Sequence, residues 1–222
     1  MILILDTATR TPVVALANDD GTLIGERRWA SHHRHGEELL QQLDGLLAEV
    51  SRTRTDVSSV IVGTGPGSFT GLRIGLATAK TIAYALAVPI VGVSSTLALA
   101  AAAANEDGEI VVTLPAGASD RYVQTIKVAD GQPVAKYPPK LVADDKVGLD
   151  DVAVDLESAP ASAIKRGESA VGGLAGALAK LGSDRLTSGK SDDVAQLVPA
   201  YVALPRGIAR ATAEMEWSPD LR

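Results

Sequence analysis

A glycine-rich loop at residues 63–71 carries the groups best placed to do chemistry. It lies between a predicted strand at 57–63 and a predicted helix at 72–87. Backbone N–H groups at such a junction can bind a phosphate, and hydroxyls can add donors. The candidate phosphate contacts are Gly65, Gly67, Ser68, Thr70 and Gly71. The loop lacks both the lysine of a Walker motif and the last small residue of a dinucleotide fingerprint. A phosphate contact and a tight turn that packs the helix on a sheet both fit this spacing.

Other residues suited to acid–base or metal chemistry are few. Asp6 ends a predicted strand at 2–6, where it can face a metal or phosphate or, as we favour, cap the following turn. The histidines, His32, His33 and His35, precede a predicted helix, which favours a surface position over a metal site. The chain has no cysteine and no G-x-S-x-G motif, which excludes disulfides, thiolate metal sites and the hydrolase nucleophile elbow.

The elements that must position these residues form a mixed α/β pattern. Apolar runs predict strands at 2–6, 12–18, 22–29, 57–63, 90–93, 110–114 and 122–128. Helical periodicity predicts helices at 36–50, 72–87, from 94 or 95 to about 105 and, more weakly, at 172–181. Residues 131–133 read as a turn, residues 137–168 show no clear pattern, and the tail from 205 is irregular. A composition shift near 106 divides the chain into an N-terminal lobe, 1–105, and a C-terminal lobe, 106–222.

Composition limits the class of function. Apolar residues make up 46% of the 222, enough for a sizeable core, and aromatics only 3%, so this core must be aliphatic and closely packed. The formal net charge of −6 predicts weak or no binding to naked RNA, because RNA binding needs clustered Lys and Arg. The first residues lack the pattern of a signal peptide and no apolar run is long enough to cross a membrane, so we expect a cytoplasmic protein.

The helix after the glycine loop carries small residues every four positions, a stripe on which another backbone can lie closely. This stripe consists of Gly71, Gly75, Ala79, Ala83 and Ala87. It can face the interior or a partner, and we predict that it forms a partner surface together with the helix at 36–50. The predicted interface residues are Leu39, Leu43, Leu46, Gly71, Arg73, Gly75, Ala79 and Ala83.

Several of these segments together resemble one family. Residues 5–9 (LDTAT), 65–75 (GPGSFTGLRIG), 89–95 (PIVGVSS) and 199–201 (PAY) are similar to segments of the TsaB (YeaZ-like) family. The resemblance is firm over 1–100 and thin beyond. Residues 115–117 (PAG) and Ala203 stand where the family often has Asp-Ala-Arg and an Arg, which puts in doubt contacts that the second lobe makes with RNA or a partner.

The resemblance implies an α/β fold of the actin/Hsp70-like class, with a mixed sheet and packed helices in each of two lobes. It also implies a non-catalytic subunit that binds and activates the TsaD transferase in forming N6-threonylcarbamoyladenosine at position 37 of tRNA. Ser95 and Leu99 stand where TsaD carries its metal-binding histidines. The implied partners are a TsaD-like transferase, a TsaE-like ATPase through the complex, tRNA through the complex, and a second copy when alone.

An alternative is an autonomous nucleotide-binding ATPase or kinase of the same fold, supported by the glycine loop and by fold analogy. A metallopeptidase needs ligands that this chain lacks. The resemblance implies that no cofactor is required by the chain itself, that weak ATP or ADP binding is allowed, and that metal and ATP chemistry belong to the partner subunits.

Overall fold

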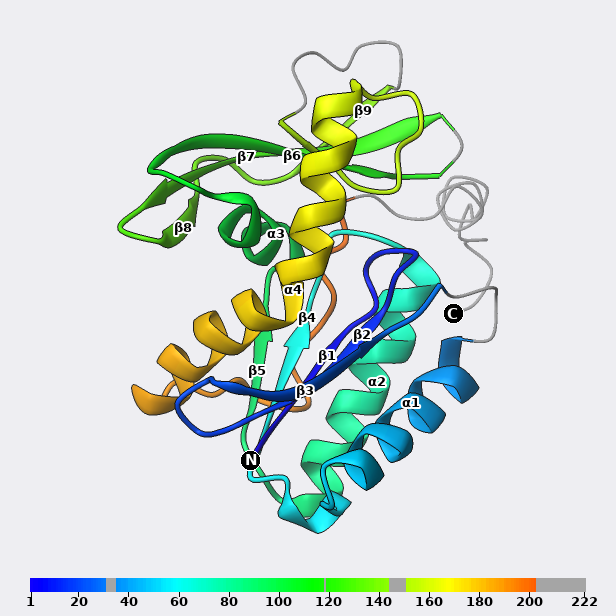
Figure 1. Ribbon diagram of the computed structural model, residues 1–222, viewed down its shortest axis with the longest axis vertical. Helices are drawn as coiled ribbons and strands as arrows, with labels where there is room; N and C mark the ends of the chain where they lie inside the picture. The colour runs from blue at the N-terminus through cyan, green and yellow to red at the C-terminus, as the bar shows by residue number, and fades with distance from the viewer. Residues whose placement is uncertain (31–34, 118, 144–150, 203–222) are drawn as a thin grey trace, which may run out of the picture.

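The computed structural model describes residues 1–30, 35–117, 119–143 and 151–202. Two sheets of five strands each are joined by two helices that touch both of them (Figure 1). Within the described ranges, none of the helices combines the length and apolarity that crossing a membrane requires.

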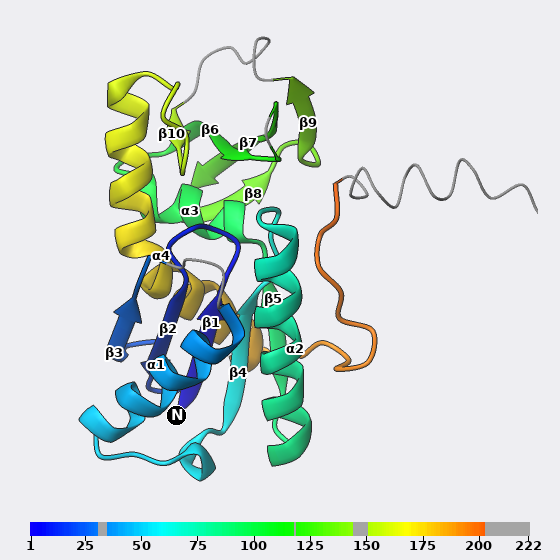
Figure 2. The same cartoon turned by 90° about the vertical axis from the view of Figure 1, so that its right-hand side faces the viewer.

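The first sheet contains β1 (Ile2–Asp6), β2 (Val13–Ala17), β3 (Leu23–Arg28), β4 (Ser59–Gly63) and β5 (Ile90–Val93), in the order β3-β2-β1-β4-β5. β1 pairs antiparallel with β2 and parallel with β4, so the central strand is covered along both edges. β1, β2 and β4 are buried along their whole length, which explains their continuous apolar runs. α1 (His35–Glu49) and α2 (Phe69–Leu86) pack on one face of this sheet (Figure 2).

The second sheet is built around the hairpin of β6 (Gly108–Pro115) and β7 (Asp120–Ala129), to which β8 (Gln132–Ala135), β9 (Lys140–Ala143) and β10 (Val152–Ala153) add. α3 (Ser95–Ala103) and α4 (Ala161–Thr187) connect the two sheets. A short 3₁₀ helix, η1 (Arg54–Asp56), precedes β4. The chain passes from the first sheet to the second between α3 and β6, near the predicted boundary at 106, and the division into lobes stays a prediction.

One hydrophobic cluster runs through both sheets, from Ile4 on β1 to Val112 on β6, with α3 and α4 in the middle. A second cluster lies between the first sheet and α1 and α2. Small residues allow the helices to pack closely on the strands. Such close packing is what the low aromatic content of the chain led us to expect. In α4, a Cβ on Gly167 would lie 1.9 Å from the Ala153 carbonyl oxygen, and one on Gly182 would lie 2.4 Å from Ile61 Cδ1.

The second half of the chain differs most from the predicted elements. The helix expected at 172–181 extends over 161–187. Its glycines pack against other segments of the same chain, so they cost less stability than they would in an isolated helix. Gln132 and Pro133, expected in a turn, begin β8, and the turn itself is at Asp130 and Gly131. The unassigned stretch 137–168 contains β9 and β10 and the start of α4. His32, His33 and the tail from 205 lie outside the described residues.

Candidate functional site

The glycine loop packs directly on the turn that follows β1. A Cβ on Gly67 would lie 2.3 Å from the Ala8 carbonyl oxygen, and a Cβ on Gly71 would lie 2.1 Å from that of Thr7. Both carbonyl groups belong to the main chain, so neither can move aside without shifting the turn. The glycines are therefore required by close packing of α2 against this turn, whatever else the loop does.

The polar groups of the loop are also used within the chain. The Ser68 N–H donates to the Ala8 carbonyl at 2.7 Å, and Ser68 Oγ accepts from the Gly71 N–H at 3.2 Å as the N-cap of α2. Thr7 Oγ1 donates to the Gly71 carbonyl at 2.7 Å, while Thr70 is exposed to solvent. These contacts favour the tight-turn interpretation, and the phosphate contact stays a prediction.

Asp6 is a buried carboxylate with two internal donors. It is 1% exposed, its Oδ1 accepts from the Ala8 N–H at 2.7 Å, and its Oδ2 accepts from Ser95 Oγ at 2.6 Å. The bond to Ala8 confirms the predicted turn cap. Burial raises the pKa of Asp6 above its ordinary value of 3.8, although both hydrogen bonds act to lower it. A Cβ on Gly63 would lie 1.8 Å from Oδ2, so this glycine makes room for the carboxylate.

The two positions that correspond to metal ligands in TsaD are both engaged in the interior. Ser95 is fully buried, and besides donating to Asp6 its Oγ accepts from the Gly65 N–H at 3.0 Å. Leu99 is fully buried in the cluster that joins the two sheets. Sequence reasoning missed the Asp6–Ser95 bond, which spans 89 positions of sequence.

Four of the five members of the small-residue stripe face the interior, which corrects the partner-surface prediction for those four, while Ala87, the C-cap of α2, is exposed. Gly71, Gly75, Ala79 and Ala83 are buried, and a Cβ on Gly75 would lie 2.1 Å from Thr7 Oγ1. The α1 residues of that prediction are buried as well: Leu39, Leu43 and Leu46. The four-residue spacing identifies a close contact, but this contact is made with the chain's own sheet. Of the predicted interface residues, Arg73 alone is exposed.

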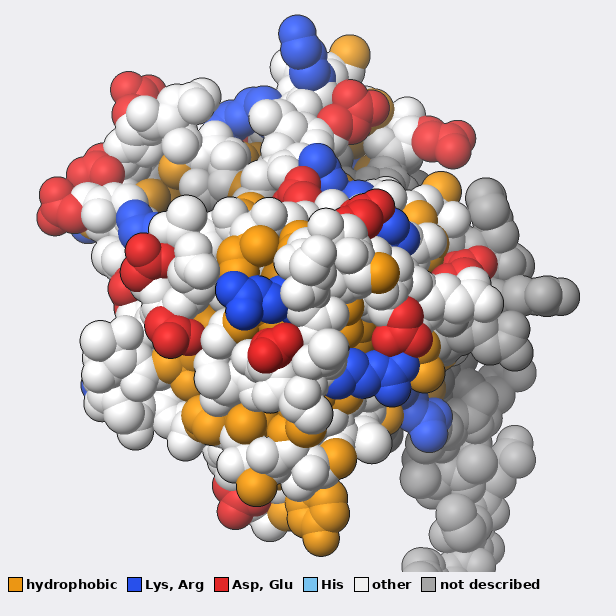
Figure 3. Space-filling model, turned by 60° about the horizontal axis from the view of Figure 1, so that its bottom comes forward, with side chains coloured by type: hydrophobic (Ala, Val, Ile, Leu, Met, Phe, Trp, Pro, Cys, Tyr) orange, Lys and Arg blue, Asp and Glu red, His pale blue; other side chains and the backbone are white. Residues whose placement is uncertain are grey.

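A different face of α2 remains open to solvent. Its exposed residues are Arg73, Ala77, Thr81, Tyr84 and Ala85. The Tyr84 side chain is 82% exposed, and Leu40 on the neighbouring α1 is 42% exposed. Figure 3 shows the underside of the molecule, on which hydrophobic groups lie among charges of both signs. We call these five residues, which with Thr70 are the exposed residues of α2, the outer α2 face.

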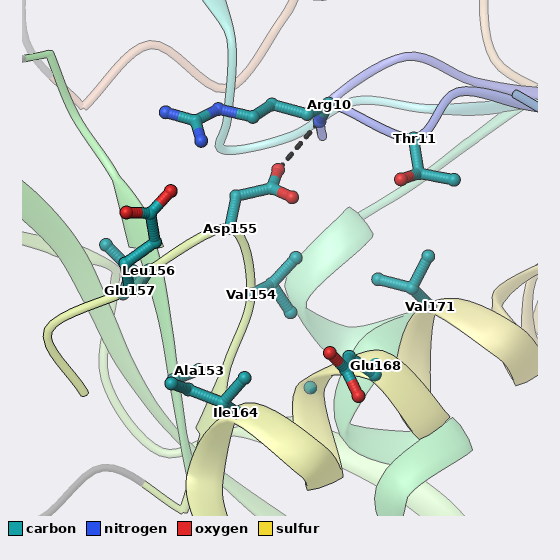
Figure 4. Close-up of a pocket in the computed structure, with 11 residues that line it drawn as sticks. Arg10, Thr11, Ala153, Val154, Asp155, Leu156, Glu157, Ile164, Glu168 and Val171 are labelled. Atoms are coloured by element: carbon teal, nitrogen blue, oxygen red, sulfur yellow. Dashed lines mark hydrogen bonds between the residues drawn. The ribbon is translucent and has the colours of Figure 1, made fainter. Parts of the chain in front are cut away.

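A pocket of about 590 Å³ opens between the turn after β1 and the segment leading from β10 into α4 (Figure 4). Its lining includes Val154, Ile164 and Glu168. The Arg10 N–H donates to Asp155 Oδ2 at 2.7 Å across the junction. Burial raises the pKa of Asp155, which this hydrogen bond partly offsets. This pairing could not be predicted, because Asp155 lies in the stretch without a clear pattern.

Comparison with known proteins shows which proteins this chain is similar to. A family model described as TsaD, tRNA N6-adenosine threonylcarbamoyltransferase, matches residues 29–136. TsaB of Bacillus subtilis is 38% identical over 109 residues, 49% of this chain and 47% of the relative. TsaB of Escherichia coli is 36% identical over 107 residues, 48% of this chain and 46% of the relative. The chain is similar to TsaB proteins over about half of its length. It spans about half the length of the curated relatives it matches.

The structure of YeaZ from Pseudomonas aeruginosa matches with a TM-score of 0.70 and 22% identity, over 90% of this chain and 98% of that chain. The predicted α/β fold, with two mixed sheets and packed helices, is confirmed, and its place in the actin/Hsp70-like class stays a prediction. Both B. subtilis and E. coli relatives are named tRNA threonylcarbamoyladenosine biosynthesis proteins.

Two segments that carry the resemblance to the TsaB family meet in space. The Ala200 N–H donates to the Thr64 carbonyl at 2.8 Å, at the edge of the glycine loop. The Tyr201 ring lies 5.3 Å from the Phe69 ring, and the Arg73 guanidinium lies 5.4 Å from the centre of the same Phe69 ring. Residues 199–201 (PAY) therefore contact the start of α2. This contact was not predicted from the sequence.

The segment at 192–201 reaches that position by running alongside α2 (Figure 2). Lys80 Nζ donates to the carbonyls of Ala195 and Leu197 at 3.2 and 3.0 Å. Asp192 Oδ2 accepts from the Gly92 N–H at 2.7 Å, and its Oδ1 accepts from Arg185 at 2.8 Å. Burial acts against the charged form of Asp192, but these hydrogen bonds outweigh it and lower its pKa. Asp192 therefore joins the segment to β5 and α4.

Replacing Asp192 by alanine is expected to cost about 1–3 kcal/mol, because it leaves the Gly92 N–H and the Arg185 guanidinium without their acceptor. The matched control is Asp44→Ala, which removes an exposed bidentate pair with Arg54 and should cost under about 1 kcal/mol. Urea midpoints of the two variants measure this difference. Equal costs would contradict the anchoring role of Asp192.

Proposed function

We propose that this chain takes part in forming N6-threonylcarbamoyladenosine in tRNA, as the non-catalytic subunit that binds and activates a TsaD-like transferase. The similarity to proteins named for this pathway supports the pathway. The use of Ser95 and Leu99 inside the chain supports the non-catalytic part. A TsaE-like ATPase and tRNA are then contacted through the complex, and the isolated chain pairs with a second copy.

The interior role of Ser95 carries the non-catalytic assignment. A serine that donates to a buried carboxylate and accepts from Gly65 has no position free to bind a metal in place of a histidine. Placing a histidine there would remove the bond that joins β1 to α3. The chemistry is therefore assigned to the partner transferase.

The outer α2 face supports the partner assignment. It combines an exposed tyrosine and an arginine, residue types enriched at binding hot spots, with small alanines that allow a helix to approach. Leu40, on the helix that packs against α2, is a further exposed apolar group. We propose this face, in place of the buried stripe, as the surface that the transferase or a second copy contacts.

Reconstitution tests the proposed function directly. The purified chain, a TsaD-like transferase, a TsaE-like ATPase and unmodified tRNA are combined with threonylcarbamoyl-AMP, and modified nucleoside is measured after digestion. We expect modification only when chain and transferase are both present. Modification by the chain alone, or equal modification by the transferase without it, would contradict the proposal.

Replacing Ala77 by arginine tests the surface. Ala77 is exposed, so its substitution should leave the thermal midpoint within about 2 °C, while association should weaken at least tenfold because the long charged side chain separates the helices. Ala161→Arg, on the exposed start of α4, is the matched control. Co-purification with the transferase and light scattering measure both associations. A folded Ala77→Arg variant that binds like the control would refute the outer α2 face.

An autonomous nucleotide-binding enzyme is the second candidate, favoured by the pocket beside Arg10. Its predicted weak ATP or ADP binding is tested by calorimetry on the purified chain, with Arg10→Ala as the variant. ATP hydrolysis that is lost in Arg10→Ala would support this candidate over a non-catalytic subunit. Hydrolysis that persists in the variant would indicate a contaminating enzyme.

A further inference from the structure

Tyr137, in the connection between β8 and β9, is an exposed aromatic side chain flanked by two cations. It is 54% exposed. Lys136 Nζ lies 5.8 Å and Lys140 Nζ 5.9 Å from the centre of its ring. Glu109 Oε1 lies 2.7 Å from Lys136 Nζ, which limits the positions of that side chain. The ring and the two ammonium groups form one compact surface, which we call the Tyr137 platform.

Two hydrogen bonds from and to β7 hold the main chain of Lys136 and Tyr137 in place. Gln124 Nε2 donates to the Tyr137 carbonyl at 3.1 Å, and the Lys136 N–H donates to the Thr125 carbonyl at 3.1 Å. Gln124 is itself 5% exposed and is fixed through Oε1 by a short hydrogen bond from Thr96 on α3. Two prolines follow Tyr137 and restrict the backbone before β9. The ring is thus presented on a fixed backbone, which lowers the entropy lost on binding.

The platform lies in a stretch with a local excess of basic residues. Residues 121–143 contain four basic residues and one acidic residue, while Asp120, Asp144 and Asp145 border the stretch and Glu109 pairs with Lys136. Lys127 is exposed on β7, and Val134, its partner across the β7–β8 ladder, is 62% exposed. An exposed aromatic ring beside lysines suits a ligand that offers both a flat base and a phosphate. An acidic peptide would use the lysines but would leave the ring without a stacking partner.

We propose that the Tyr137 platform is an RNA contact, in which the ring stacks on an unpaired base and Lys136 and Lys140 approach the flanking phosphates. The inference rests on the proposed function, because tRNA is the substrate of that pathway. One stacked base with two ion contacts binds weakly by itself, in agreement with the weak binding to naked tRNA predicted from the net charge. Within a complex the same contact acts intramolecularly and adds to the binding by the other subunits.

Fluorine NMR on the isolated chain tests the contact without assuming any partner. The chain has four tyrosines, Tyr84, Tyr122, Tyr137 and Tyr201, so labelling with 3-fluorotyrosine is expected to give one resonance each, assigned by tyrosine-to-phenylalanine variants. Unmodified tRNA, a short single-stranded RNA and polyglutamate are titrated separately. We expect tRNA and the single strand to shift the Tyr137 resonance and leave the exposed Tyr84 unchanged, and high salt to reverse the shift. A larger response to polyglutamate, equal shifts of both tyrosines, or no shift at millimolar RNA would overturn the proposal.

Filter binding of tRNA to the complex of chain and transferase provides the second test. Tyr137→Ala should weaken binding roughly 5- to 100-fold, the range for loss of one stacked base, while Tyr137→Phe should stay within about twofold. Lys140→Gln should reduce the salt slope of log K by about one. Tyr84→Ala serves as the exposed-tyrosine control. Unchanged tRNA affinity in Tyr137→Ala, with the complex intact, would refute the platform alone, whereas failure of the wild-type chain to bind transferase would refute the proposed function.

Discussion

Replacing Gly71 by alanine is expected to destabilise the chain by about 3 kcal/mol or more, at the upper end of the cost of overpacking. The new Cβ would lie 2.1 Å from the Thr7 carbonyl oxygen, which belongs to the main chain of the turn after β1. Relief requires the turn or the whole start of α2 to move. Urea unfolding measures the loss, and we expect a reduced yield of folded protein as well.

Gly75 provides a graded comparison on the same helix. Its Cβ would lie 2.1 Å from Thr7 Oγ1, a side-chain atom, so rotation of Thr7 can relieve part of the clash and Gly75→Ala should cost less than Gly71→Ala. Gly75→Leu has no such relief, and its thermal midpoint should fall sharply. The control is Gly108→Ala, because a Cβ at Gly108 meets nothing within 4 Å. A well-folded Gly75→Leu monomer with weakened association would restore the original partner-surface prediction.

The first half of the fold could be predicted because its local signals agree. The apolar strands, the period of α1 and the loop before α2 each indicate the element that forms. Beyond residue 106 the strands predicted at 110–114 and 122–128 correspond to β6 and β7, but the later elements differ from the prediction. α4 carries glycines that normally weaken a helix, and they are tolerated because Gly167 and Gly182 contact β10 and β4. Such compensation depends on tertiary packing and leaves no local pattern.

The candidate site could be predicted only in part, because local patterns do not show which distant segments meet. Spacing correctly marked the α2 stripe as a close contact, but spacing does not tell which backbone is approached. The Asp6–Ser95 bond, the contact of Arg10 with Asp155 and the contact of Tyr201 with Phe69 join residues far apart in sequence. Each contact depends on tertiary packing, which no local pattern of the sequence shows. The Tyr137 platform did carry a signal, a tyrosine between lysines and prolines, within a stretch that has no regular period.

Replacing Asp6 by alanine is expected to cost about 2–4 kcal/mol at neutral pH. The substitution leaves the Ala8 N–H and the Ser95 hydroxyl buried without their acceptor and opens a small cavity beside Gly63. Asp6→Asn should cost much less, because the amide oxygen can still accept from Ala8 and the amide nitrogen can donate to Ser95 Oγ. Chemical unfolding of the two variants separates lost hydrogen bonds from lost charge.

The pH dependence of the asparagine variant tests the buried charge. Burial raises the pKa of Asp6 in the folded chain above 3.8, so the stabilising contribution of its protonated form is fully present below that value. It is lost as pH rises through the folded pKa, and the asparagine variant should not show this loss. The free energy of unfolding of Asp6→Asn relative to wild type should therefore increase as pH rises above 3.8.

Asp20 provides a control, because its pKa is shifted in the opposite direction to that of Asp6. Its pKa is lowered by hydrogen bonds from the backbone and side chain of Thr22, so its contribution is present above 3.8 and is lost as pH falls. Asp20→Asn should therefore lose stability relative to wild type as pH rises. A flat difference for Asp6→Asn between pH 3.5 and 7, measured beside a sloping one for Asp20→Asn, would mean that the Asp6 carboxylate is not penalised by burial. The bonds from Ala8 and Ser95 would then fully replace the water it has lost.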